Sequence, residues 1–155
     1  MCERAVSRTS HGKLLGQHQM IQDYIALSHT EIQAARLLTF HTAWKMDKFG
    51  AARVRADLGM VKAHVSKTVL GVLDRTIQVC GALGYSSDLP VEEWYRSTRF
   101  GPIGDGPDEL HKSVLARTLL KDYAPVTGWP TEHIPSRRPA AEAKWAELRA
   151  AAGLE

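Results

Sequence analysis

The stretch "IGDGPDELHK" at residues 103–112 places one carboxylate, Asp105, between two glycines and just before a proline that can open a helix. A carboxylate in such a position most commonly accepts a hydrogen bond from a free backbone amide of the following helix. The same position also suits a general base, because Gly104 and Gly106 would let a substrate approach the main chain without an intervening side chain. The position of Asp105 leaves both roles open.

The histidines and cysteines show no metal-binding pattern. Four histidines have no second metal-ligating residue at the spacing that a metal site needs: His41, His64, His111 and His133. We interpret them as ordinary polar or packed residues. Cys2 and Cys80 are too few for a disulfide framework and lack the C-x-x-C spacing. We therefore expect no metal site and a reducing, cytoplasmic location.

The composition is that of one soluble domain with a real core, since 44% of the 155 residues are hydrophobic and 24% are charged. The net charge of +3 comes from scattered lysines and arginines, which argues against a nucleic-acid partner. No apolar run is long enough for a membrane span, and "MCERAVSRTSHGK" has no signal-peptide core.

Two long helices should position the candidate residues. Residues 18–49 contain no proline or glycine and show helical apolar spacing, and Gly50 should end this helix. A second helix should follow from residue 51 to about Gly84 and pack antiparallel to the first. Its interior glycines, Gly59 and Gly71, each cost about 1 kcal/mol relative to alanine and should mark close contacts with other helices.

Shorter helices complete the predicted fold. Pro90 should open a third helix, and Pro107 a fourth that runs to about Tyr123 and carries Asp108 and Glu109 in its first turn, where the helix dipole favours acidic residues. No segment shows the alternation of a strand. We predict an all-α, up-and-down four-helix-bundle-like domain over residues 18–123, preceded by the end of a helix and a loop at 1–17. A proline-rich linker and a C-terminal helix should occupy residues 124–155.

Three segments together resemble a known family: "SRTSHGKLLGQHQMIQ", "DRTIQVCGALGYSSDLPVEEWYRSTR" and "GDGPDELHKSVLAR". In order and spacing they are similar to the C-terminal helical domain of the acyl-CoA dehydrogenase family of flavoproteins, and the resemblance covers roughly residues 2–123. Members of that family oxidise an acyl-CoA thioester. A carboxylate takes the alpha proton while the beta hydride passes to the flavin of FAD, and an electron-transfer acceptor then reoxidises the flavin.

The resemblance implies roles for individual residues. Asp105 occupies the place of the base, where a glutamate directly before a glycine is usual, and Gly106 lies where the main chain approaches the thioester. Contacts with FAD are implied for Arg8, Ser10, His18, Gln19, Gln78, Gly81, Ala82 and Glu109. Ala82 stands where the family has a second glycine. In the family, the residues of the loop after the first helix contact the flavin of a neighbouring subunit.

The resemblance also implies what accompanies the chain. Family members are two to three times as long, so we expect the upstream domains to supply most of the flavin and acyl-CoA contacts and the chain alone to be inactive. A homo-oligomer (a dimer or a dimer of dimers) or a partner subunit carrying those domains would complete the site. The alternative hypothesis is a non-catalytic helical module for self-association or partner docking, because the apolar face of residues 54–79 is wider than one neighbouring helix can cover.

Overall fold

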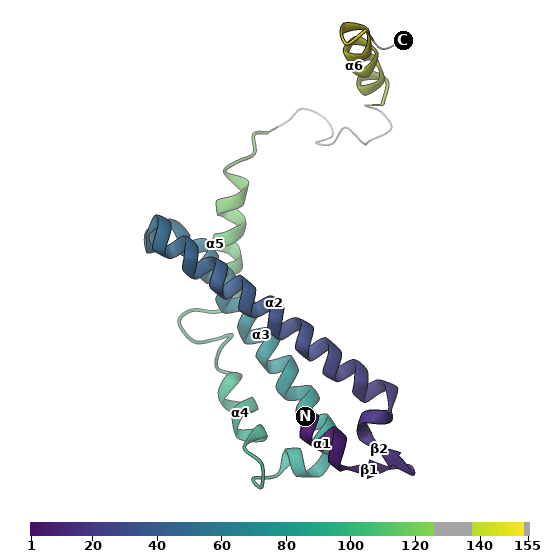
Figure 1. Ribbon diagram of the computed structural model, residues 1–155. Helices are drawn as coiled ribbons and strands as arrows, with labels where there is room; N and C mark the ends of the chain where they lie inside the picture. Colours follow the sequence, from purple (N-terminus) through teal and green to yellow (C-terminus); the bar gives the residue numbers. More distant parts are fainter. Residues whose placement is uncertain (126–137, 154–155) are drawn as a thin grey trace. The chain divides into compact units, whose positions relative to one another are not determined.

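The computed structural model describes residues 1–125 and 138–153, which divide into two units at Leu120 (Figure 1). In the second unit, helix α6 spans Arg138–Ala151, which confirms the C-terminal helix predicted from its alanine-rich sequence. The linker predicted after Ala124 lies largely outside the described residues. The first unit, residues 1–120, contains all the candidate site residues.

The first unit begins with a short helix and a small hairpin. Helix α1 spans Cys2–Ser7, and the antiparallel strands β1 (Thr9–Ser10) and β2 (Lys13–Leu14) follow it. Both turn residues have left-handed backbones, with φ of 50° at His11 and 79° at Gly12, as a two-residue hairpin turn requires. The prediction of a chain without strands is wrong here, because strands of two residues are too short to produce an alternating pattern.

Two long helices form the frame of the first unit. After a 3-10 turn at Leu15–Gln17, helix α2 spans Gln19–Phe49 and ends at Gly50, whose φ is 82°. A second 3-10 turn, η2 at Ala51–Val54, leads into helix α3 at Arg55–Cys80. The ammonium of Lys45 lies 2.5 Å from Asp57, so the end of α2 faces the start of α3. This antiparallel pairing confirms the sequence-based prediction.

Helix α3 is the central element of the first unit. It packs against α2, against the 3-10 turn η3 (Gly81–Tyr85), against α4 (Val91–Thr98) and against α5 (Asp108–Leu120) (Figure 1). The helical fold is therefore as predicted, although α5 ends at Leu120 rather than near Tyr123. The segment between α4 and α5, residues 99–107, carries Asp105, and Lys62 in the N-terminal half of α3 donates to the carbonyl of the neighbouring Gly106.

The two glycines inside α3 have different surroundings. A Cβ built on Gly59 would lie 3.1 Å from both Cβ and Nδ1 of His111, so α5 crosses α3 closely at this point. A Cβ on Gly71 would meet only the guanidinium of Arg75, at 3.7 Å. The prediction of a close helix contact is confirmed for Gly59 and is wrong for Gly71.

The described core is made of small side chains. Its buried apolar residues are Ala5, Ala35, Val54, Ala63, Val79, Cys80 and Val91. Several larger apolar side chains of α2 are exposed instead, among them Leu37 (69%), Phe40 (64%) and Trp44 (52%). Among the helices of the described residues, none combines the length and apolarity needed to cross a bilayer.

Candidate functional site

The segment that carries Asp105 is a sequence of hydrogen-bonded turns. The amides of Ile103 and Gly104 both donate to the carbonyl of Phe100, at 2.9 and 2.8 Å. The amide of Asp108, the first residue of α5, donates to the carbonyl of Pro102 at 3.0 Å. The pliable loop expected from its glycines is therefore tied to itself and to the start of α5.

Two side chains from outside the segment hold successive carbonyls of its backbone. The Nε2 atom of His111 on α5 lies 3.1 Å from the carbonyl oxygen of Asp105. The ammonium of Lys62 on α3 donates to the carbonyl of Gly106 at 2.5 Å and to the carboxylate of Asp108 at 3.1 Å. We call the bonds from His111 and Lys62 to these two carbonyls the loop clamp.

The loop clamp was missed in the sequence. His111 was interpreted there as an ordinary polar residue, and Lys62 was not singled out. Lys62 is 44 residues before Gly106, so only the packing of α3 against α5 brings the two together. The proximity of His111 to the "GDG" turn, six residues earlier, was the one available signal.

The glycines on either side of Asp105 have separate structural causes. A Cβ on Gly104 would overlap the ring of Phe100, with the ring Cζ only 2.9 Å away. The position that a side chain at Gly104 would take is therefore filled by Phe100, which by itself accounts for the glycine. Gly106 has a φ of 92°, which is a left-handed backbone that favours glycine.

The side chain of Asp105 is exposed, and its carboxylate makes no hydrogen bond with any residue that the structure describes. The amide of Asp108, which it would cap in the more common role, is taken by Pro102. Asp105 also has a φ of 55°, and within residues 1–125 and 138–153 the only other non-glycine residue with positive φ is His11. Helix capping therefore does not explain this residue.

A second group of predicted residues lies around the hairpin. His18 is half-buried, and its Nε2 lies 3.1 Å from the carbonyl of Ser10, which joins the hairpin to the start of α2. The hydroxyl of Ser10 lies 3.0 Å from Nδ1 of His11. Arg8 and Gln19 are exposed, and neither side chain makes an ion pair or hydrogen bond within the described part of the chain.

The donors near the hairpin suit an anionic ligand. Arg4 lies in α1, and Arg8 follows the helix directly as its C-cap residue with an extended backbone. The Nε of Arg4 is buried and has no hydrogen-bond partner among residues 1–125 and 138–153. Guanidinium groups without carboxylate partners match phosphate oxygens in charge and in geometry. The residues present at this end therefore fit a cofactor that carries a pyrophosphate.

The third group lies where α3 ends. Gln78 is exposed in the last turn, and Gly81 follows with a φ of 63° and no atom within 4 Å of its missing Cβ. Ala82 is also exposed. Backbone and side-chain polar groups are thus accessible at this end of α3.

The structure divides the predicted residues between two places. The hairpin and η3 lie at the same end of the α2–α3 pair, whereas the segment between α4 and α5 and the start of α5 lie toward the other end of α3 (Figure 1). That segment carries Asp105 and Gly106, and the exposed Glu109 is in the first turn of α5. Lys62 and Gln78 are both on α3, and the helical rise of 1.5 Å per residue puts them about 24 Å apart. One chain therefore does not assemble all the predicted residues around one point.

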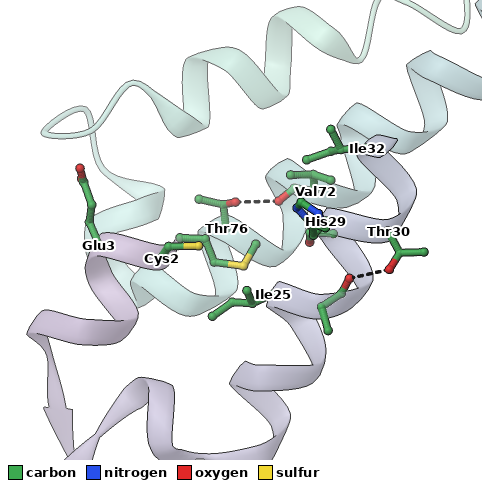
Figure 2. Close-up of a pocket in the computed structure, with 11 residues that line it drawn as sticks. Cys2, Glu3, Ile25, His29, Thr30, Ile32, Val72 and Thr76 are labelled. Atoms are coloured by element: carbon green, nitrogen blue, oxygen red, sulfur yellow. Dashed lines mark hydrogen bonds between the residues drawn. The ribbon is translucent and has the colours of Figure 1, made fainter. Parts of the chain in front are cut away.

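A cavity that the sequence did not indicate lies between α1, α2 and α3 (Figure 2). It has a volume of about 850 Å³ and is lined mainly by apolar atoms, with Cys2, Ile25, Ile32 and Val72 among its residues. The hydroxyl of Thr76, which also lines it, donates its proton to the carbonyl of Val72 at 2.7 Å, so toward a ligand it could only accept. None of the predicted site residues lines this cavity. Residues 1–125 and 138–153 contain no group of three or more histidine, cysteine, aspartate or glutamate side chains that could hold a metal ion.

Comparison with known proteins decides the family. Residues 1–120 match the family model described as "Acyl-CoA dehydrogenase, C-terminal domain". The chain belongs to the acyl-CoA dehydrogenase family. Acyl-CoA dehydrogenase family member 11 of Rattus norvegicus is 40% identical over 124 residues, which are 80% of this chain and 16% of the rat protein.

Solved structures agree with this assignment to the acyl-CoA dehydrogenase family. Glutaryl-coenzyme A dehydrogenase in complex with glutaryl-CoA has a TM-score of 0.71 and 29% identity, covering 79% of this chain and 31% of that one. PigA in complex with FAD has a TM-score of 0.71 and 25% identity, covering 76% of this chain and 30% of that one. The family is FAD-dependent, and this chain matches less than a third of either structure.

Proposed function

We propose that the chain is the FAD-contacting, oligomerising C-terminal part of an acyl-CoA dehydrogenase, in which Asp105 removes the alpha proton of an acyl-CoA thioester. The observation that carries the proposal is the carboxylate of Asp105, which has no partner in the described residues, on a turn fixed by the loop clamp. A free carboxylate on a fixed backbone is what a general base needs. Membership of the acyl-CoA dehydrogenase family supports the choice of substrate.

The exposure of Asp105 has a consequence for this role. A carboxylate in water is a weak base, and exclusion of water by surrounding groups favours proton uptake. The structures of glutaryl-coenzyme A dehydrogenase and PigA are about three times as long as the matched part of this chain. We therefore assign the covering of Asp105, and most contacts with acyl-CoA, to protein outside this chain.

Most of the proposed FAD contacts would be made by groups near the C-terminal end of α3. When bound, FAD supplies the acceptor for the hydride that leaves the beta carbon. Arg8 would bind the pyrophosphate, with Ser10, His18 and Gln19 beside it on the hairpin and the start of α2. Gln78, Gly81 and Ala82 would contact the adenine side, and Glu109 would add a polar contact near Asp105.

The separation of about 24 Å along α3 supports a role for a neighbouring subunit. Asp105 and the hairpin of one chain would serve two different flavins, one in each of two subunits. The exposed apolar side chains of α2, including Leu37, Phe40 and Trp44, support self-association as a dimer or dimer of dimers. A partner subunit with the upstream domains is the other arrangement, and an electron-transfer acceptor would reoxidise the flavin in either.

The same exposed side chains favour a second candidate, a helical module that only self-associates or docks a partner. The two candidates differ in FAD binding. A self-association module alone would form a stable oligomer in the ultracentrifuge and would leave FAD unbound even when the upstream domains are present. The proposed dehydrogenase would bind FAD only in the assembled protein.

The test is to co-express the chain with the upstream domains that its relatives carry and to follow bleaching of the flavin on addition of acyl-CoA. Asp105→Asn should slow bleaching by about 10²- to 10⁴-fold, the usual contribution of a general base, and leave the FAD content unchanged. Asp122→Asn is the matched control, because Asp122 is an exposed carboxylate beyond α5. Normal bleaching by Asp105→Asn would falsify the assignment of the base.

A further inference from the structure

We infer that Lys62 and His111 are positioning residues for Asp105, and this inference rests on the proposed function of Asp105 as a base. Neither side chain needs to touch the substrate. Each holds one of two successive carbonyls, those of Asp105 and Gly106, and so fixes the backbone from which the carboxylate extends. The two donors come from different helices, α3 and α5, so the orientation of the Asp105 carboxylate depends on how those helices pack against each other.

The backbone that these bonds hold is one that the chain would not adopt without support. Asp105 and Gly106 have φ values of 55° and 92°, both in the left-handed region. Aspartate tolerates this region better than most residues, yet it remains less favourable than a right-handed backbone. Residues in such conformations persist where surrounding contacts determine them, and they gather at functional sites. The loop clamp supplies those contacts.

His111 has a defined role in the loop clamp. A carbonyl oxygen only accepts hydrogen bonds, so the ring nitrogen that faces it at 3.1 Å, Nε2, must carry a proton to donate to it. On the other side of the ring, Nδ1 lies 3.1 Å from where a Cβ of Gly59 would be. The absence of a side chain at Gly59 therefore creates the place in which the imidazole sits.

Lys62 acts through a charge that is partly removed from water. Its side chain is 21% exposed, and that of its ion-pair partner Asp108 is 9% exposed. Hydrogen bonds from an ammonium are stronger than those from a neutral donor, and the carboxylate of Asp108 offsets the cost of burying the cation. The amide of Asp108 also donates to the carbonyl of Pro102, before the turn that contains Asp105. Asp108 therefore connects this turn to the ammonium of Lys62 on α3.

The first test needs neither FAD nor acyl-CoA and uses nuclear magnetic resonance of the chain. We expect ¹⁵N spectra to show the Nε2–H form of His111, and a strong intraresidue NOE between HN and Hα to show the positive φ of Asp105. His111→Leu should weaken that NOE and raise the exchange rate of the Asp108 amide about tenfold, the effect of losing one hydrogen bond. His111→Gln keeps an N–H donor at a similar reach and should retain both signals.

Lys62 is tested with its partner changed at the same time. Lys62→Met alone would leave the buried carboxylate of Asp108 without a cation, so we combine it with Asp108→Asn. The double variant should also raise the exchange rate of the Gly104 amide. Lys112→Met, at an exposed lysine beside His111, is the control and should change neither signal. Wild-type signals in His111→Leu, or equal changes in Lys112→Met, would overturn the inference.

A second test uses the assembled dehydrogenase. His111→Leu should lower kcat by about 10- to 100-fold with little change in KM, since a small misplacement of a catalytic group has an effect of that size, and His111→Gln should restore kcat. Full kcat in His111→Leu, when Asp105→Asn is inactive, would reject the positioning role. Full activity in Asp105→Asn would instead reject the proposed base and leave the measured loop clamp intact.

Discussion

The Nε atom of Arg75 on α3 lies 2.9 Å from the hydroxyl of Ser28 on α2, and the same guanidinium forms an ion pair with Glu31. Ser28 is only 5% exposed, so its hydroxyl depends on this contact. The Arg75–Glu31 ion pair joins the two long helices near the end that carries the hairpin. The Lys45–Asp57 ion pair joins them near the other end.

Arg75→Met should lower the free energy of unfolding by about 2 kcal/mol, because it leaves a buried hydroxyl and a partly buried carboxylate without a donor. Urea denaturation measures this change. Arg96→Met is the control, since Arg96 pairs with Glu92 on the surface of α4 with its side chain 78% exposed, and its loss should be much smaller. Equal losses in the two variants would contradict the importance of the Arg75 contact.

Alanine substitutions at Gly59 and Gly71 should change the stability of the chain in opposite directions. Gly71→Ala should stabilise the chain by up to about 1 kcal/mol, since alanine favours the helix and meets only a flexible guanidinium. Gly59→Ala gains the same propensity but pushes its methyl group into His111, and overpacking of this kind typically costs about 1–3 kcal/mol. Thermal unfolding of the two variants tests the prediction, which fails if Gly59→Ala is the more stable.

Gly104 and Phe100 should be energetically coupled. Gly104→Ala should cost about 1 kcal/mol in the wild-type chain, because the new methyl group displaces the Phe100 ring. The same substitution should cost almost nothing in Phe100→Ala, where the ring is absent. A double-mutant cycle on unfolding free energies gives the coupling, and additive effects would show that the ring moves away without cost.

Arg8→Gln should weaken FAD binding to the assembled dehydrogenase by about 10- to 100-fold, the value of a charge-assisted hydrogen bond to a phosphate. Titration of the apoprotein with FAD, followed by flavin fluorescence, measures the affinity. Arg55→Gln removes an equally exposed arginine from the opposite end of the α2–α3 pair and should leave the affinity unchanged. An unchanged affinity in Arg8→Gln would remove the hairpin from the proposed cofactor site.

The long helices were predictable because their signals are local. Helical spacing identified α2 and α3, and Gly50 marked the break between them, where its φ of 82° now explains the residue type. Gly71 shows the limit of such reasoning, since a glycine inside a helix does not reveal whether another helix lies against it.

The candidate site was predictable only in part. The resemblance to acyl-CoA dehydrogenases pointed to Asp105, but the sequence could not show that Lys62 lies against the same turn, because that contact depends on tertiary packing across 44 residues. Phe100 likewise fills the space at Gly104, although the residue is 68% exposed and nothing in the sequence pairs the two. Glycines in a short segment indicate that another group packs closely against the backbone, but they do not reveal which group it is.

Helix α3 is one uninterrupted helix of 26 residues, with Lys62 in its N-terminal half and Gln78 in its last turn. A tilt or axial rotation of this helix would therefore shift the turn of the proposed base and the end proposed to face adenine at the same time. Substitutions that bend α3 between these residues should impair both together, so a loss of flavin and a loss of proton abstraction in such a variant would have one mechanical origin.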